Sequence, residues 1–393
     1  MQKIITKIGL PFSEVISEKM LYADKTEYIY NMVNSCQVCL LCRPRHFGKS
    51  LLLSTIEALF LGQRSLFQGL WIDTSDYAFA KHPIIKLSMN YSGTSEPGVL
   101  EDRIIHTLQT LGTSEGLSIS DFSLDVALEA LVRGLYNKHN NLKTAPSDNL
   151  RTALRVVILI DDYDAPVIDY LDQPAIAQAN LATLHGFYRC FKNLDEKIHF
   201  VLLTGVSQAA SVSLGQSSNN IVDISLKPEY AGICGFTLQD LDNLFADRYE
   251  DTLRALIDKD MMPPNSTVAD LKAEILKWYD GYVFDGQTPF DETSLDKATR
   301  VLNPFSIVNF FDNKSFSDYW LRSGPPSFLP KLIANDPDAF IFEEPLRYSE
   351  ESLSSFIPGS VSPVPILFQT GYLTLNGVSW KDRKTPYSLK IPN

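Results

Sequence analysis

Five consecutive apolar residues, Val156 to Ile160, restrict the fold of this chain more than any other feature of its sequence. A strand without a polar position is buried on both faces, and such strands belong to parallel sheets that helices cover on both sides. Asp161 follows the run directly. Its carboxylate is therefore expected at the carboxyl edge of the sheet, where open α/β sheets bind their ligands.

A second polar segment, Arg-Pro-Arg-His-Phe-Gly-Lys-Ser, occupies residues 43–50. Apolar residues precede it over 38–42, and leucine and isoleucine recur at helical spacing after it, up to a stop at Gly62. A loop between a strand and a helix offers backbone N–H groups to a phosphate, while its lysine and serine suit the phosphate and Mg²⁺. We therefore predict an ATP site formed by Arg43, Pro44, Arg45, His46, Phe47, Gly48, Lys49, Ser50 and Leu51.

This loop departs from the usual G-x-x-x-x-G-K-S/T pattern at its first position. Arg43 stands where a glycine normally allows the backbone to bend. The tripeptide Gly48-Lys49-Ser50 is intact, but by itself it also arises by chance, in a basic turn that caps a helix. The phosphate interpretation is favoured because the acidic strand end at Asp161 supplies the second half of such a site.

Four positions are assigned to the metal and the reaction. Ser50 and Asp161 are the predicted Mg²⁺ ligands, since hydroxyl and carboxylate oxygens suit this ion. Asp162 is predicted to orient or deprotonate the attacking water. Thr204, at the end of a strand over 198–204, is predicted to contact the γ-phosphate or its water. The alternatives are a solvated acidic turn after the strand and a Thr204 that only caps its own strand.

The predicted fold class is α/β: a P-loop NTPase parallel sheet with helices on both faces, followed by further modules. Strands over 84–89 and 198–204 alternate with helical stretches, which places the sheet within residues 1–235. Residues 236–345 are predicted to be a helical, lid-like domain, in which Asn303 caps a helix that begins at Pro304. Residues 346–393 are predicted to form a small α/β or winged-helix-like module.

Composition limits the partners and the cellular compartment that are expected for the protein. The net charge of −12 disfavours a surface broadly adapted to nucleic acid. No apolar run is long enough to span a bilayer, and the N-terminus lacks the core of a signal peptide. Five cysteines, a small and odd number, favour a reduced, cytoplasmic compartment. Cys36, Cys39 and Cys42 have a spacing that suits a metal, but a fourth ligand is missing, so buried core thiols are favoured.

These features belong to an ordered set of segments that resembles the AAA-ATPase-like family, which is often fused to a C-terminal PD-(D/E)XK nuclease-like domain. The resemblance spans nearly the whole chain. The matching segments are 22–26 (YADKT), 43–50 (RPRHFGKS), 159–166 (LIDDYDAP), 203–205 (LTG), 219–220 (NN), 230–237 (YAGICGFT), 278–282 (WYDGY), 303–307 (NPFSI), 369–373 (QTGYL) and 391–393 (IPN). The resemblance implies an ATP-binding protein in which Arg43 is an ordinary loop residue.

Departures from the family pattern imply slow turnover. Asp162 replaces the usual glutamate, Gln208 stands near a usual arginine, and His46 replaces a basic residue. We expect Asp162→Glu to raise the rate of hydrolysis and Gln208→Arg to add to it. The sequence ends about where a nuclease-like domain would begin and carries no Asp followed by Glu-x-Lys there. No nuclease activity is therefore expected.

Three functions remain open at this point. The first is a slow ATPase or an ATP-dependent molecular switch. The second is a catalytically degenerate scaffold that binds nucleotide or an unidentified protein partner. The third is the ATPase module of a nucleic-acid-processing system, which the acidic charge disfavours. The aromatic segment 278–282 permits stacking on a base, although packed turns use such residues more often.

Overall fold

The structure, a computed structural model, describes residues 3–91, 93, 96, 98–119, 123–140, 153–208, 221–287, 299–323, 328–335, 346–354, 363–379, 384 and 386–392. The segment 219–220 that matches the family pattern lies outside these residues, as do the positions 209 and 210 that follow Gln208.

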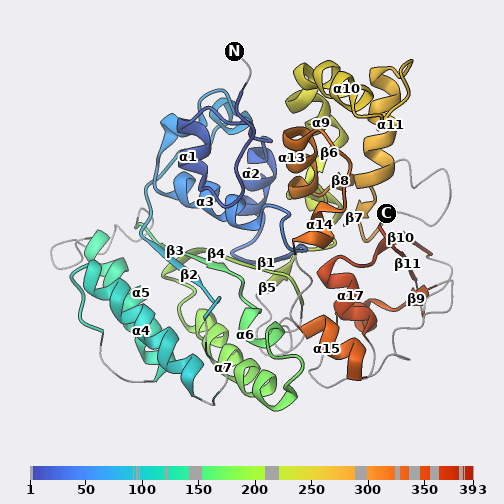
Figure 1. The fold of residues 1–393 in the computed structure, drawn as a ribbon. Coiled ribbons are helices and arrows are strands. Elements are labelled where there is room, and N and C mark those ends of the chain that lie inside the picture. Colours follow the sequence, from blue (N-terminus) through green and yellow to red (C-terminus); the bar gives the residue numbers. More distant parts are fainter. Residues whose placement is uncertain are drawn as a thin grey trace.

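A five-stranded parallel sheet forms the centre of the molecule (Figure 1). Its order is β2-β3-β4-β1-β5. The strands are β1 (Val38–Cys42), β2 (Ile84–Ser88), β3 (Val156–Asp161), β4 (Ile198–Gly205) and β5 (Ile221–Asp223). Strand β4 therefore lies between β1, which leads into the loop at 43–50, and β3, which ends at Asp161. The predicted α/β class with a parallel sheet is confirmed.

Helices cover both faces of this sheet (Figure 1). One face carries α1 (Phe12–Ser17), α2 (Thr26–Ser35) and α3 (Lys49–Phe60), and the other carries α4 (Val99–Ser114), α5 (Leu124–Asn140), α6 (Ala165–Ile168) and α7 (Pro174–Asn193). In β3, Val157 and Leu159 pack with the first group, whereas Ile158 and Ile160 pack with the second. Burial on both faces explains why this strand contains no polar residue before its end. No helix in the described ranges is both long and apolar enough to cross a membrane.

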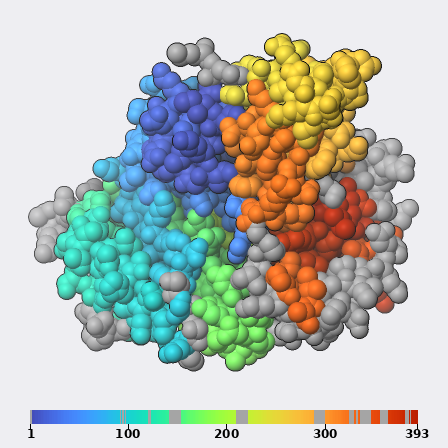
Figure 2. Space-filling model, in the orientation of Figure 1, coloured from blue at the N-terminus to red at the C-terminus, as the bar shows by residue number. Residues whose placement is uncertain are grey.

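A mainly helical region, residues 236–287 and 299–323, lies beside the N-terminal segment and is coloured yellow to orange in Figures 1 and 2. Its helices are α9 (Leu238–Phe245), α10 (Tyr249–Asp258), α11 (Val268–Tyr279), α13 (Pro304–Asn313) and α14 (Tyr319–Arg322). The strands β6 (Phe236–Thr237), β7 (Tyr282–Val283) and β8 (Arg300–Leu302) form a small antiparallel sheet within it. The Asn303 side chain accepts a hydrogen bond from Ser306 N–H at 3.1 Å, so its predicted role as the cap of α13 is confirmed.

Most of the aromatic segment 278–282 is packed rather than open. The Trp278 ring stacks on Phe316, with 5.5 Å between centroids, and Tyr279 is buried in the core of the helical region. Tyr282 contacts Phe47 of the loop edge to face, at 4.8 Å between centroids. These contacts are those of a packed turn, and Tyr282 connects that turn to the loop at 43–50.

The C-terminal part of the chain packs on the same core as the sheet. It comprises α15 (Phe328–Asn335), β9 (Leu346–Tyr348), α16 (Glu350–Ser354), α17 (Val364–Thr370), β10 (Thr374–Val378) and β11 (Tyr387–Lys390), with the strands in the antiparallel order β10-β11-β9. Ile366 and Leu375 belong to the apolar cluster that also contains Ile158 of β3. This part therefore shares its core with the sheet, and the domain boundaries at 235 and 345 stay predictions.

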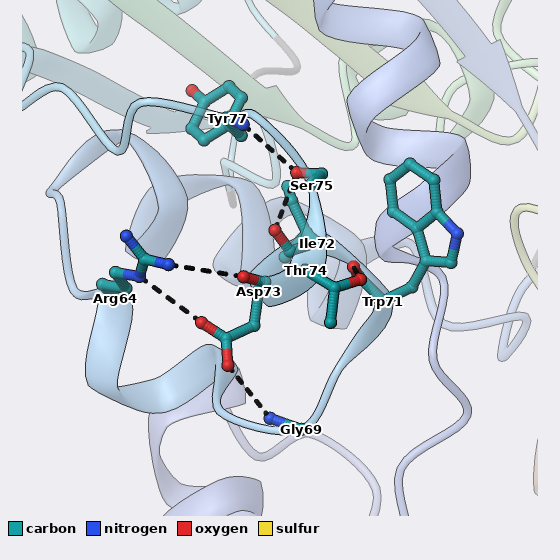
Figure 3. A network of polar contacts seen from close by, with 8 residues as sticks. All are labelled: Arg64, Gly69, Trp71, Ile72, Asp73, Thr74, Ser75 and Tyr77. Atoms are coloured by element: carbon teal, nitrogen blue, oxygen red, sulfur yellow. Dashed lines mark hydrogen bonds and ion pairs between the residues drawn. The ribbon is translucent and has the colours of Figure 1, made fainter.

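A polar turn between α3 and β2 is organised by one carboxylate (Figure 3). Asp73 accepts hydrogen bonds from Arg64 Nε and from Gly69 N–H, both at 3.4 Å. The turn is attached to the start of α2, because the carboxylate of Asp24 accepts a hydrogen bond from Trp71 N–H at 2.6 Å. Asp24 thus has a structural role that no sequence pattern indicated.

Cys36 and Cys39 form a disulfide between the end of α2 and the start of β1. Their Cα atoms lie 6.1 Å apart, a separation that a disulfide can span, because the chain turns between the helix and the strand. This corrects the prediction of reduced core thiols at these two positions. Cys42 has a free, buried thiol. Within the described residues no group of three or more His, Cys, Asp or Glu side chains is placed to hold a metal ion.

Leu202 of β4 tests the central position of that strand, because its side chain is 0% exposed. Leu202→Ala is expected to lower the free energy of unfolding by about 2–5 kcal/mol, since it removes buried methyl groups and leaves a cavity. Urea denaturation followed by circular dichroism measures the loss. Leu321→Ala is the control, because Leu321 is 53% exposed and should change stability by only about 0.5 kcal/mol. Equal losses in the two variants would contradict the central placement of β4.

Candidate functional site

A cavity of about 1040 Å³ opens at the carboxyl edge of the sheet. It is lined by residues 45–52 of the loop and α3, by Asp161, Asp162 and Asp164, and by segments distant in sequence at 6–11, 233–236 and 304–308. The predicted phosphate loop and the predicted acidic strand end are therefore brought together in one cavity. Three of the predicted site residues do not line it: Arg43, Pro44 and Thr204.

The loop bends at His46 and Gly48. Their φ angles are +68° and +96°, in the left-handed region, whereas Arg43 is not among the described residues with positive φ. Glycine adopts this conformation without strain, and histidine is found there more often than most residues. The backbone therefore needs no glycine at position 43, which explains how this loop accommodates an arginine there.

Arg43 lies beneath the loop rather than in the cavity. Its side chain is fully buried, and the guanidinium donates to the carbonyl oxygens of Cys42 at 2.8 Å, Ser225 at 2.7 Å and Tyr230 at 2.9 Å. It also lies over the ring of Phe284, 4.1 Å from the centroid. Burial lowers the pKa of Arg43 to about 10, so the side chain stays charged at neutral pH. Its contacts make it a support for the loop, and direct binding of ATP by Arg43 stays a prediction.

Lys49 and the loop backbone form a group of donors at the start of α3. The buried ammonium of Lys49 donates to the carbonyl oxygens of Arg43 at 3.0 Å and Pro44 at 3.1 Å. Within the described part of the chain, the backbone N–H groups of residues 46–50 have no hydrogen-bond acceptor. Several unpaired N–H donors beside a lysine, at the N-terminus of a helix, are an arrangement that suits a phosphate group.

Asp161 and Thr204 end neighbouring strands and are hydrogen-bonded to each other. Thr204 Oγ1 donates to Asp161 Oδ1 at 2.8 Å, and Asp162 N–H donates to the same oxygen at 3.1 Å. Asp161 Oδ2 has no hydrogen-bond partner among the described residues. One carboxylate oxygen is thus fixed by the fold while the other is free for a ligand. The fully buried Thr204 contacts Asp161 and does not line the cavity, and its predicted contact with a phosphate or its water stays a prediction.

Asp162 lines the cavity from a left-handed backbone conformation, with φ of +50°. Aspartate tolerates this conformation better than most residues do. Burial raises the pKa of Asp162 to about 6; the neighbouring charge of Asp161 adds to the rise and that of Lys49 opposes it. The carboxyl group therefore changes its protonation state close to neutral pH, which suits a group that accepts a proton from water.

Asp164 and Gln208 organise the turn after β4. The buried carboxylate of Asp164 accepts hydrogen bonds from Ser207 N–H and Ser207 Oγ, both at 2.6 Å. The side-chain amide of Gln208 donates to the carboxylate of Asp223 at 2.7 Å, and Gln208 does not line the cavity. An arginine at this position would meet Asp223 first. This placement argues against the expectation that Gln208→Arg adds to turnover.

The rest of the cavity wall comes from segments for which no role was predicted. Residues 6–11 contribute to it without any recognisable motif. Lys25 also lines it, and its ammonium lies 2.6 Å from Asp240 Oδ2, at the start of α9. Phe305 stacks on His46 of the loop, with 4.8 Å between ring centroids. Lys25 and Phe305 lie in segments that match the family pattern, which was the one signal that could have indicated them.

Asp162→Asn tests whether the pKa of Asp162 is raised, because asparagine also tolerates the left-handed conformation but carries no charge. The folded state raises the pKa of Asp162 from 3.8 to about 6. The contribution of Asp162 to stability is therefore complete at a pH below its pKa in the unfolded chain. It is lost as the pH rises through its pKa in the folded protein. Relative to the wild type, the variant should gain thermal stability between about pH 4 and about pH 8, measured as unfolding temperatures. A constant difference across this range would show that Asp162 titrates normally.

Two comparisons relate the chain to known proteins. A family model described as "Predicted AAA-ATPase" matches residues 8–215, which is more than half of the chain. An "Uncharacterized protein in vnfD 5'region" from Azotobacter chroococcum mcd 1 is 30% identical over 373 residues. That alignment covers 95% of this chain and 64% of the relative, so the chain spans less than two thirds of the relative's length. No solved structure is a significant match.

Proposed function

The chain belongs to the AAA-ATPase-like family, and on that premise we propose that it binds Mg-ATP in the cavity and acts as a slow ATPase or ATP-dependent switch. The observation that carries this proposal is the loop at 43–50. Its unpaired N–H donors and Lys49 share one cavity with Asp161 and Asp162. Donors for phosphate oxygens, a carboxylate for a cation and a carboxyl group that titrates near neutral pH are the parts that phosphoryl transfer requires.

The loop residues divide into those that bind phosphate and those that support the loop. The N–H groups of 46–50 and the ammonium of Lys49 bind the phosphate oxygens. Lys49 exchanges its two carbonyl partners for charged oxygens, which form stronger hydrogen bonds. Arg43 and Pro44 act from behind, since neither lines the cavity. Burial and the charges of Lys49 and Arg45 lower the pKa of His46, so its ring is neutral at pH 7.

The metal assignment rests on two oxygens. The hydroxyl of Ser50 and Oδ2 of Asp161 are hard oxygen ligands of the type that suits Mg²⁺. When bound, the ion would offset the charge of the phosphate groups. Thr204 acts as a positioning residue by holding Asp161 Oδ1. Asp162 accepts the proton of the attacking water, and its aspartate is one methylene shorter than the usual glutamate, which limits its reach. The effect of Asp162→Glu stays a prediction.

The remaining cavity has room for the nucleoside. Its volume of about 1040 Å³ is at the upper end of ligand sites, which span about 300–1,000 Å³. Leu10, Phe236 and Phe305 supply apolar surface for a base. A scaffold that binds nucleotide without hydrolysing it is the second candidate, favoured by the short reach of Asp162. A protein partner and a cytoplasmic location are proposed with both, and nucleic acid is disfavoured by the net charge of −12.

Lys49→Ala tests the phosphate site. Removing the ammonium should weaken Mg-ATP binding at least about tenfold, measured by isothermal titration calorimetry on the folded variant. Lys277→Ala is the control, because Lys277 is an exposed lysine outside the cavity whose side chain is 75% exposed. Phosphate release from the same wild-type sample then separates a slow ATPase from a scaffold. Unchanged affinity in Lys49→Ala would refute the proposed site.

Asp161→Asn tests the metal assignment. The amide keeps an acceptor for Thr204 and Asp162 but loses the charge, so ATP affinity should no longer rise when Mg²⁺ is added. Titrations with Mg²⁺ and with EDTA measure the difference. Asp73→Asn is a matched control, since this carboxylate organises a turn (Figure 3) whose residues do not line the cavity. A variant that still gains affinity from Mg²⁺ would assign the ion to another carboxylate.

A further inference from the structure

The start of the loop is in contact with two segments from the C-terminal third of the chain. Gly371, which follows α17, has φ of +91°, and a Cβ at this position would lie 2.7 Å from Pro44 Cγ. Trp320 of α14 donates its indole N–H to the carbonyl of Arg45 at 3.3 Å. The rings of Trp320 and Tyr372 pack with centroids 5.0 Å apart. Both the left-handed conformation and the close approach to Pro44 restrict position 371 to glycine.

The same C-terminal segment reaches the turn that follows β4. Gln369 Oε1 accepts a hydrogen bond from Gln208 N–H at 2.9 Å, and the amide of Gln369 also donates to the carbonyl of Leu353 at 2.5 Å. The helix before Gly371 is buried along its whole length in the core shared with the sheet. Residues 369–372 therefore contact the chain at the ends of both β1 and β4, and they rest on a rigid base.

We propose that Gly371 and Trp320 are positioning residues for the loop and couple its occupancy by nucleotide to the C-terminal module, residues 363–392. This inference rests on the proposed binding of Mg-ATP. Neither residue lines the cavity, so both act through Pro44 and Arg45. Arg43 anchors the loop to segments 225–230 from below, and the C-terminal contacts hold the next two residues.

These contacts also indicate how nucleotide binding at the loop would affect the contact between Pro44 and Gly371. The ammonium of Lys49 donates to the carbonyl of Pro44. When this ammonium turns to a phosphate, Pro44 loses that hydrogen bond, and Pro44 is the residue that Gly371 touches. Binding thus changes the forces on a loop residue that packs against Gly371, directly after α17. In the opposite direction, displacement of the loop would misplace its N–H donors and weaken their hydrogen bonds to the phosphate oxygens, which lowers affinity.

Gly371→Ala tests the contact against a matched glycine. The added Cβ should push Pro44 away and weaken Mg-ATP binding by about tenfold or more, the effect of losing about one hydrogen bond to a charged phosphate oxygen, measured by calorimetry. Gly69→Ala is the control, because Gly69 also has positive φ, +79°, but a Cβ there meets nothing within 4 Å, and its N–H bond to Asp73 remains (Figure 3). It imposes similar backbone strain and should change affinity less than about twofold. Unchanged affinity in Gly371→Ala, or equal weakening in both variants, overturns the proposal.

A double-mutant cycle with Pro44→Gly separates the effect of the Gly371–Pro44 contact on affinity from a general disruption of the structure. Both Pro44 atoms that a Cβ at 371 would meet, Cγ at 2.7 Å and Cβ at 2.8 Å, are absent in this background. Gly371→Ala should then cost much less affinity than it does in the wild type, because the close contacts with Pro44 are gone and the other neighbour of a Cβ, Trp320 Cζ2 at 3.4 Å, lies at an ordinary van der Waals distance. Additive losses overturn the proposal. Trp320→Phe serves if Gly371→Ala does not fold, and it should weaken binding because it removes the donor to Arg45.

The fluorescence of Trp320 tests the coupling, because a merely structural role of Trp320 would not make its emission depend on nucleotide. The chain has four tryptophans, so Trp71→Phe, Trp278→Phe and Trp380→Phe leave Trp320 as the sole emitter. Mg-ATP should change its emission, and Lys49→Ala should abolish the change. Without nucleotide, Gly371→Ala should make Trp320 more accessible to acrylamide than Gly69→Ala does. If calorimetry shows no ATP binding, the proposed function fails and the acrylamide result still tests the contact. If ATP binds and Trp320 emission stays constant, the coupling is overturned alone.

Discussion

A buried guanidinium beneath the loop is the interaction on which the site depends. Arg43 has no carboxylate within hydrogen-bonding distance among its described partners; backbone carbonyls at 42, 225 and 230 and the ring of Phe284 compensate for the loss of water. Because these carbonyls belong to separate segments, one side chain fixes the exit of β1 against the segment after β5 and the turn before β6. The bends then fall at His46 and Gly48, where they present the N–H groups of the loop.

The second organising constraint is the position of β4 between β1 and β3. Arg43 N–H donates to the carbonyl of Gly205 at 3.0 Å, and Thr204 Oγ1 donates to Asp161. Both halves of the site are therefore aligned against consecutive residues of a single strand. Because β4 is buried on both faces and hydrogen-bonded to both β1 and β3, it sets the position of the loop relative to the acidic residues.

The fold was largely predictable from sequence, and the site was predictable in part. Apolar runs in the sequence predicted β3 and β4, and the end of such a run predicted Asp161 and Asp162. Burial and position along a strand can be predicted from the local sequence pattern. The orientation of a side chain cannot. Arg43 and Thr204 have the residue types of ligand-binding groups, yet they turn into the core. Gly371 acts on Pro44, more than three hundred residues away in sequence, and no local pattern can reveal a contact of that range.

The ion pair of Lys25 and Asp240 joins the wall of the cavity to the first turn of α9. A single oxygen, Asp240 Oδ2, receives the ammonium of Lys25 at 2.6 Å and both the N–H and the hydroxyl of Thr237 at 2.8 Å. The side chains of Lys25 and Asp240 are only 10% and 17% exposed, so dissolved salt screens their attraction weakly. Fraying of the first turn of α9 would therefore also break the ion pair that joins the helical region to the start of α2, and added salt would weaken that pair only slightly.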